Sequence, residues 1–122
     1  MFYYKELSKK ILGSAFEVYN ILGNGFLEKI YENSMLVELD KKNLHFNNQK
    51  ALDVRYKDEI VGSYYADIVV EDKIILELKT CNSIIPEHRA QILNYLKATG
   101  YKVGYLLNFG HKDKLEYERY VF

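Results

Sequence analysis

Two apolar segments are each interrupted by charged residues whose types could bind a cation or handle a proton. Asp67 lies within the apolar run 65–70, and Glu77 and Lys79 lie within 74–80. Side chains of a strand alternate between its faces, so Glu77 and Lys79 would share one face. Burying a carboxylate and an ammonium there is costly unless they are paired or bind a metal. The pattern therefore predicts a buried ion pair, an edge strand with solvated charges, or a site that uses all three groups.

The length of the loop between the two segments decides whether Asp67 and Glu77 can share a site. A two-residue loop at 71–72 would place Ala66 opposite Glu77 and turn Asp67 away. A three-residue loop at 71–73 places Asp67 directly opposite Glu77 on the same face, because a slip of one residue reverses every side chain. We predict the odd-length loop or an equivalent bulge. An ordinary two-residue hairpin would contradict a shared site.

The elements that must position these residues can be predicted from the period of the apolar positions and from Gly and Pro. In chain order we expect helices over 7–22 and 27–43, strands over 52–56, 60–70 and 74–80, a helix over 86–99, and strands over 103–107 and 115–121. On the second helix, Glu32 is expected away from the apolar stripe. A strand, a crossover helix and a further strand require a mixed β-sheet flanked by helices. The fold class is therefore α/β (α+β), in the order α-α-β-β-β-α-β-β.

Length, charge and cysteine content bound the remaining possibilities. The 122 residues fit one domain spanning 1–122. With 17 Lys plus Arg against 17 Asp plus Glu, the chain is not a strongly basic nucleic-acid coat. The single Cys81 excludes an internal disulfide and a Cys-rich zinc site. No apolar run approaches the roughly 18–20 residues of a membrane helix, and the N-terminus lacks a signal pattern, so a cytoplasmic protein is expected.

Several stretches carry a resemblance to a known family. Asp67, nine intervening residues and Glu77-Leu78-Lys79 resemble the D…(D/E)xK signature of the PD-(D/E)XK nuclease superfamily. The stretch 25–31, GFLEKIY, is similar to the pattern that names the GxxExxY family of small bacterial proteins, which is assigned to that superfamily. Further matches follow in order at 65–73, 88–96, 99–100 and 107–110. The resemblance implies a restriction-endonuclease-like core of α-β-β-β-α-β type, which agrees with the element order above.

The resemblance also implies roles for the strand residues. Asp67 and Glu77 would be carboxylate ligands of Mg²⁺ or Mn²⁺, with the Leu78 carbonyl as a backbone ligand. Lys79 would orient or activate the attacking water and stabilise charge on the phosphate. Such a site would hydrolyse a phosphodiester bond of DNA or RNA by in-line attack. The proline of the superfamily name is Ala66 here, a position that contributes no functional group.

Five residues on the predicted helices complete the implied site. Glu28 would be a further metal ligand, and the alternative is a solvated glutamate in the first turn of a helix. Gln91 would hold the lysine, the water or a phosphate. His88 would contact a phosphate or the scissile region, although a lone histidine on a helix is more often structural. Tyr31 and Tyr95 are candidates for supporting the site or contacting the substrate, although most of the 12 tyrosines fit half-buried structural positions.

The function expected from these residues is a metal-dependent nuclease, and two alternatives remain open. One is a non-catalytic nucleic-acid-binding or assembly domain on a nuclease scaffold, since fold does not fix function. The other is a hydrolase of a different phosphate-containing substrate. A chain this small has little room for a specificity module, so a homodimer or a partner protein is expected. The zero net charge predicts weak engagement of nucleic acid that depends on metal.

Overall fold

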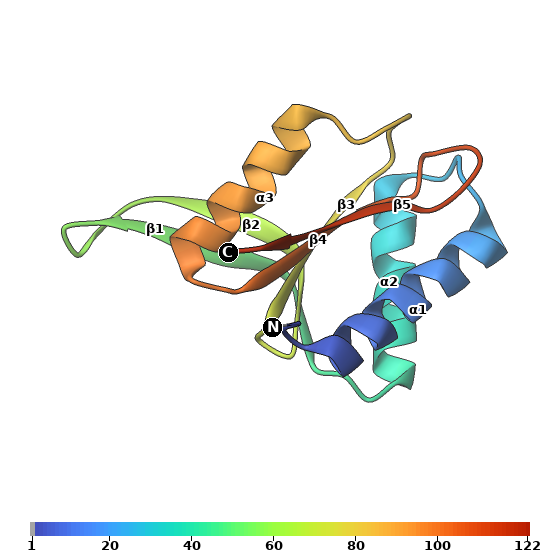
Figure 1. The fold of residues 1–122 in the computed structure, drawn as a ribbon, viewed down its shortest axis with the longest axis horizontal. Helices are drawn as coiled ribbons and strands as arrows, with labels where there is room; N and C mark the ends of the chain where they lie inside the picture. The colour runs from blue at the N-terminus through green and yellow to red at the C-terminus, as the bar shows by residue number, and fades with distance from the viewer. Residues whose placement is uncertain (1) are drawn as a thin grey trace.

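The computed structural model describes residues 2–122, which form three helices and one five-stranded sheet (Figure 1). The elements are α1 (Lys5–Leu22), α2 (Glu28–Lys41), β1 (Phe46–Tyr56), β2 (Glu59–Val70), β3 (Ile74–Lys79), α3 (Pro86–Thr99), β4 (Val103–Asn108) and β5 (Glu116–Val121). This confirms the predicted order. The largest difference is β1, which begins at Phe46 rather than Leu52. No helix in the described range has both the length and the apolar character needed to cross a membrane.

The sheet has the strand order β1-β2-β3-β4-β5 and is mixed, as predicted. Neighbouring strands are antiparallel except β3 and β4, which are parallel and joined by the α3 crossover. Helices α1 and α2 pack on one face of the sheet, and α3 covers the other (Figure 1). The sheet is thus buried between two helical layers, and β3 runs through its centre between β2 and β4.

The loop between β2 and β3 has the predicted three residues. Val70 pairs with Ile74, and Glu71 and Asp72 in the loop have the left-handed φ angles 53° and 56°. The amide of Lys73 closes the turn on the Val70 carbonyl at 3.0 Å. This register brings Asp67 level with Glu77, which the alternative two-residue loop would not allow.

Helix α2 carries the predicted apolar stripe but also buries a charge. Tyr31, Met35 and Leu39 are fully buried against the sheet. The expectation that Glu32 lies on the polar side is wrong, because this residue is only 3% exposed. Glu32 follows the buried Tyr31 directly. Its carboxylate is kept in the interior by Gln49 of β1 and Lys29 of α2. Leu27, expected in the stripe, precedes the helix and is 76% exposed.

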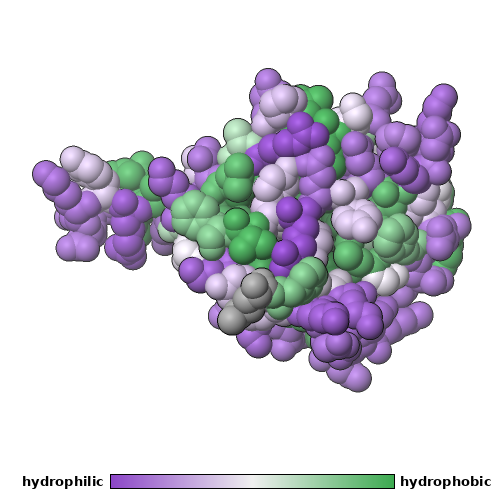
Figure 2. Space-filling view, viewed as in Figure 1, coloured by the Kyte–Doolittle hydropathy of each residue, from purple (hydrophilic) through white to green (hydrophobic). Residues whose placement is uncertain are grey.

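The β1–β2 hairpin extends beyond the rest of the sheet as an arm (Figure 1). Most of its visible surface is hydrophilic (Figure 2). Its turn consists of Lys57 and Asp58, both with positive φ, which matches the twist of a two-residue hairpin. Leu52 on the arm is buried with Tyr95 and Leu96 of α3. One face of the arm therefore lies against α3.

Candidate active site

Asp67 and Glu77 lie where β2 and β3 stop pairing. The ladder between these strands ends at Ile68 and Leu76. Beyond it, the amide of Leu78 donates to Asp67 Oδ2 at 2.8 Å, and the amide of Asp67 donates to Glu77 Oε1 at 3.1 Å. Two carboxylates thus replace the strand-to-strand hydrogen bonds at this point. They are held side by side, each fixed by a backbone amide of the opposite strand.

The two carboxylates carry charge that the interior disfavours. Glu77 is 3% exposed, and burial together with the nearby Asp67 raises its pKa to about 8, although the Asp67 amide and Lys79 oppose this. Burial is also the main cause of the raised pKa of Asp67, and the Glu32 carboxylate adds to it. Neighbouring acids with raised pKa values are typical of sites that hold a proton or a cation.

Lys79 is the last residue of β3, and its side chain is held by α3. Its Nζ donates to Gln91 Oε1 of α3 at 3.3 Å. Lys79 and Glu77 are two residues apart on one strand, and Lys79 influences the pKa of both acids of the pair. The structure thus brings the predicted lysine and the predicted glutamine together, next to the carboxylates.

Helix α2 and strand β1 supply further polar groups to the same place. Gln49 donates from Nε2 to Glu32 Oε1 at 3.1 Å and to Asp67 Oδ1 at 3.4 Å. Lys29 Nζ lies 3.3 Å from Glu32 Oε2, forming a salt bridge within α2. Glu28 is exposed at the start of α2. Its pKa is raised by partial loss of water and by the Asp67 and Glu32 carboxylates, while Lys79 lowers it. Glu28 thus belongs electrostatically to the same cluster.

Glu32 and Gln49 were missed by reasoning from the sequence. For Glu32 a signal existed, because it lies four residues after Glu28 and so on the same side of the helix. For Gln49 the sequence offers no signal. Its φ of 52° is left-handed within a strand, and its contacts join segments that are far apart along the chain.

Comparison with known proteins decides the family. A family model of the PD-(D/E)XK nuclease superfamily matches residues 5–120. The chain belongs to this superfamily. Nucleases of the superfamily generally use divalent metal ions. A comparison with curated protein sequences gives no match.

Two solved structures share the superfamily fold at low sequence identity. The crystal structure of SSO0001 aligns with a TM-score of 0.59 and 20% identity, covering 97% of this chain and 59% of that one. An alkaline exonuclease (LHK-Exo) from Laribacter hongkongensis aligns with a TM-score of 0.51 and 12% identity, covering 93% of this chain and 81% of that one. The chain thus spans less than two thirds of SSO0001. These likenesses support the fold of the superfamily.

His88 and Tyr95 lie on the same helix as Gln91 but contact different partners. His88 Nδ1 accepts a hydrogen bond from the amide of Ile85 at 3.2 Å, which caps the start of α3. Burial and Lys79 lower the pKa of His88, which favours the neutral ring needed for this bond. Tyr95 is buried, and burial together with Glu77 and Asp67 raises its pKa to about 12. Tyr95 therefore borders the carboxylates as a protonated phenol.

Tyr31 is tied to the junction between α1 and α2. It is fully buried and stacks on Phe109 with ring centroids 4.7 Å apart. Its hydroxyl donates to the Gly23 carbonyl and accepts from the Phe26 amide, the latter at 3.3 Å. The structure thus has Tyr31 fixing the loop that leads into α2. That helix begins at Glu28, so the loop fixed by Tyr31 directly precedes this residue.

The donor chemistry of the cluster fits a hard divalent cation. Within residues 2–122, no three His, Cys, Asp or Glu side chains stand in a ready-made metal-binding group. However, Asp67 and Glu77 are adjacent, poorly solvated and of raised pKa, and Glu28 shares their electrostatic environment. Glu77 uses one oxygen for the Asp67 amide, so its second oxygen is open to a cation, whereas a cation at Asp67 would share an oxygen that already accepts a hydrogen bond. Oxygen donors of this kind suit Mg²⁺ and Mn²⁺.

Proposed function

We propose that this chain is a metal-dependent nuclease that hydrolyses phosphodiester bonds of DNA or RNA. Within the superfamily we assign it to the GxxExxY group, on its stretch 25–31, and we take 1–122 as one domain. The observation that carries the proposal is the pair of Asp67 and Glu77 beside Lys79, in a chain of the PD-(D/E)XK superfamily. Two carboxylates that could hold a divalent cation and a neighbouring lysine supply the kinds of group that such a hydrolysis uses.

The residues have distinct roles in this proposal. Asp67 and Glu77 would hold Mg²⁺ or Mn²⁺, assisted by Glu28 and the Leu78 carbonyl. When bound, the cation supplies positive charge that offsets the negative charge developing on the phosphate. Metal would also remove the unfavourable repulsion between the two buried carboxylates.

Lys79 is the group that meets the phosphate or the attacking water. An ammonium has three donors, and Gln91 Oε1 takes one of them. Two donors are then free to stabilise a phosphate oxygen or to orient a water. Because the end of the side chain is fixed by α3, little reorganisation is needed when charge develops, and this is the main source of such electrostatic stabilisation.

The test is cleavage of labelled single-stranded DNA, duplex DNA and RNA in Mg²⁺ or Mn²⁺. We expect cleavage by the wild-type protein and a loss of about 100- to 1,000-fold in Asp67→Asn and Lys79→Ala, the usual effect of removing one charge-stabilising group. Lys9→Ala, an exposed site on α1, is the matched control for Lys79→Ala. Folded wild-type protein that binds no divalent metal and cuts none of these substrates would rule the nuclease out.

A second candidate function is a non-catalytic nucleic-acid-binding domain. The observation that favours it is that both carboxylate oxygens of Asp67 already accept hydrogen bonds, Oδ2 from the Leu78 amide and Oδ1 from Gln49. Salt-dependent binding of nucleic acid without cleavage, unchanged in Glu77→Gln, would support this function over the first. We further propose that a second copy or a partner protein supplies specificity, and the mass in solution by light scattering tests for a second copy.

A further inference from the structure

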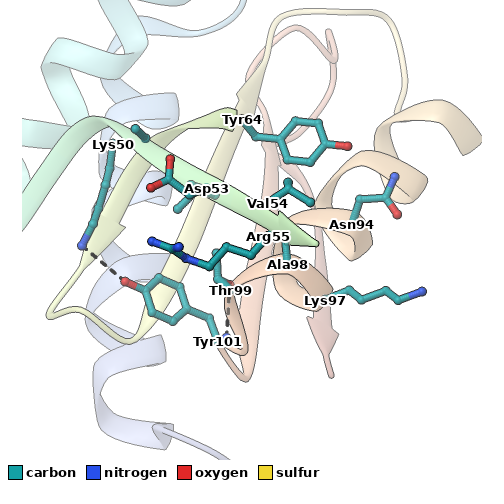
Figure 3. A pocket seen from close by; sticks show the side chains of 12 residues that line it. Lys50, Asp53, Val54, Arg55, Tyr64, Asn94, Lys97, Ala98, Thr99 and Tyr101 are labelled. Carbon is teal, nitrogen blue, oxygen red and sulfur yellow. Dashed lines mark hydrogen bonds between the residues drawn. The ribbon is translucent and has the colours of Figure 1, made fainter. Parts of the chain in front are cut away.

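Two adjoining hollows run between the β1–β2 arm and α3. The larger, of about 650 Å³, lies between β1 and the second half of α3, with Tyr101 on its wall (Figure 3). The smaller, of about 460 Å³, lies along the first half of α3. Tyr64 and Asn94 line both hollows and form the boundary between them. The two hollows therefore make one continuous track along the arm.

The smaller hollow reaches the edge of the candidate active site at Gln91. Gln91 lines the smaller hollow, and the same side chain accepts the hydrogen bond from Lys79. An elongated ligand lying in the track would thus pass Gln91, cross the boundary at Tyr64 and enter the larger hollow. Its near end would be beside Lys79.

The larger hollow offers positive charge. Lys50, Arg55 and Lys97 line it, against a single acid, Asp53. Lys50 is already paired with Asp72 at 2.8 Å. Arg55 donates to a backbone carbonyl, and no carboxylate of residues 2–122 forms a salt bridge with Arg55 or Lys97. Both side chains are exposed, so two cations are available for phosphates.

The boundary between the hollows is aromatic. The ring of Tyr64 lies 4.9 Å from that of Tyr95, tilted by 44°. Tyr95 is buried against the sheet and supports Tyr64, which itself is 38% exposed. A supported, partly exposed aromatic ring between two polar hollows is the arrangement on which an unpaired base stacks.

We propose that this track binds a single-stranded polynucleotide, with Tyr64 stacking on a base and with Arg55 and Lys97 binding phosphates beyond it. Ligand pockets measure roughly 300–1,000 Å³, and both hollows fall within that range. The exposed face of Tyr64 calls for an unpaired base, because the bases of a duplex are stacked on one another. The inference rests on the proposed function for the end of the strand at Lys79. It adds the substrate class and the path of the strand.

The test measures binding separately from cleavage. Fluorescence anisotropy of labelled 15-nucleotide oligo-dT, oligo-rU and a blunt DNA duplex is recorded in EDTA over a range of salt concentrations. Each lost phosphate contact to a single strand makes the negative slope of log K against log salt shallower by about 0.7, so Arg55→Ala/Lys97→Ala should make it shallower by about 1.4. Lys9→Ala/Lys41→Ala removes the same charge from exposed positions on α1 and α2 and should leave the slope unchanged.

Tyr64 is tested with two variants. Tyr64→Ala should weaken single-strand binding roughly 5- to 150-fold, the range found when a stacking residue is removed. Tyr64→Phe keeps the ring and should bind as the wild type does. If Tyr64→Ala does not fold, the Arg55→Ala/Lys97→Ala slope decides, because both substituted side chains are on the surface.

Failure of this inference is distinct from failure of the nuclease proposal. Unchanged single-strand affinity and salt slope in the track variants would overturn the track, even in a protein that cleaves. An equal loss of duplex binding would overturn the single-strand assignment. Conversely, track-dependent binding by a protein that never cleaves in Mg²⁺ or Mn²⁺ would support the track and reject the nuclease.

Discussion

The side chain of Asn108 hydrogen-bonds both backbone groups of Cys81, the amide and the carbonyl. Its Oδ1 accepts from the Cys81 amide at 3.1 Å, and its Nδ2 donates to the Cys81 carbonyl at 2.9 Å. The same side chain also binds Glu116 Oε1 and the Gly110 amide. Cys81 follows Lys79 by two residues, and Lys79 pairs in register with Asn108. This asparagine therefore fixes the end of the strand that carries the lysine.

We predict that Asn108→Ala destabilises the protein and slows catalysis. Asn108 is fully buried, and its removal leaves the Cys81 amide and carbonyl without their partner, which costs about 1–3 kcal/mol per unsatisfied group. Urea unfolding measures the loss, and the rate at saturating substrate measures the effect on Lys79. Asn82→Ala, exposed in the following loop, is the control. Wild-type stability in Asn108→Ala would contradict the role assigned to this residue.

Gly110→Ala should disturb the same junction by overcrowding. A Cβ at position 110 would lie 2.5 Å from the nitrogen and 2.6 Å from the oxygen of Cys81, which are backbone atoms that cannot easily move away. We expect a destabilisation of about 1–3 kcal/mol, as for other overpacked sites. Gly13→Ala is the matched control, because nothing lies within 4 Å of its Cβ and Ala is favoured within helix α1 by about 0.5–1 kcal/mol. Thermal melts of the two variants should therefore shift in opposite directions.

The stability of the metal-free protein should fall as the pH rises from about 4.5 to about 8. Burial raises the pKa of Glu77 from 4.5 to about 8, so the folded state holds this proton more tightly than the unfolded state. Its contribution is complete below pH 4.5 and is lost as the pH approaches 8, a change on the order of a few kcal/mol. Urea unfolding in EDTA at pH 5 and pH 8 measures it.

Two variants show which group is responsible for this pH dependence. Glu77→Gln should flatten it, with Asp67 supplying a remainder of the same sign because its pKa is also raised. Glu59→Gln, an exposed acid at the start of β2, should behave as the wild type does. Equal slopes in Glu77→Gln and the wild type would contradict the burial of an ionisable pair.

Added Mn²⁺ or Mg²⁺ should restore the stability that is lost at pH 8. A cation that binds only the folded state stabilises it by about 2.7 kcal/mol at 100 times its dissociation constant. The rise in melting temperature should disappear in Glu77→Gln and Asp67→Asn and should persist in Gln91→Ala, which removes no carboxylate. An equal rise in the Glu77→Gln variant would place the cation elsewhere on the chain.

The sequence predicted the fold and the pairing of the two acids because both depend on local patterns. The order of elements follows from apolar periods, and the 71–73 loop alone determines which residue faces Glu77. The start of β1 was missed because residues 47–49, Asn-Asn-Gln, are poor strand formers that extend here through pairing with β2. Glu32 shares a helix side with Glu28, but its burial depends on Gln49, which reaches it from a distant part of the chain and has no sequence signal of its own.

The short pairing between β2 and β3 has a mechanical consequence. The backbone ladder between the β1–β2 arm and β3 covers 68–70 alone on β2, and beyond it the two strands are joined by the carboxylates of Asp67 and Glu77, whereas β3 and β4 pair along their whole length. Asp67 is the first residue of β2 beyond that ladder, and it follows Tyr64 by three residues. A shift of the arm relative to β3 would therefore also move the Asp67 carboxylate and its hydrogen bond from the Leu78 amide. Binding of a nucleic-acid strand along the arm would then be linked to the alignment of the two carboxylates, Asp67 and Glu77.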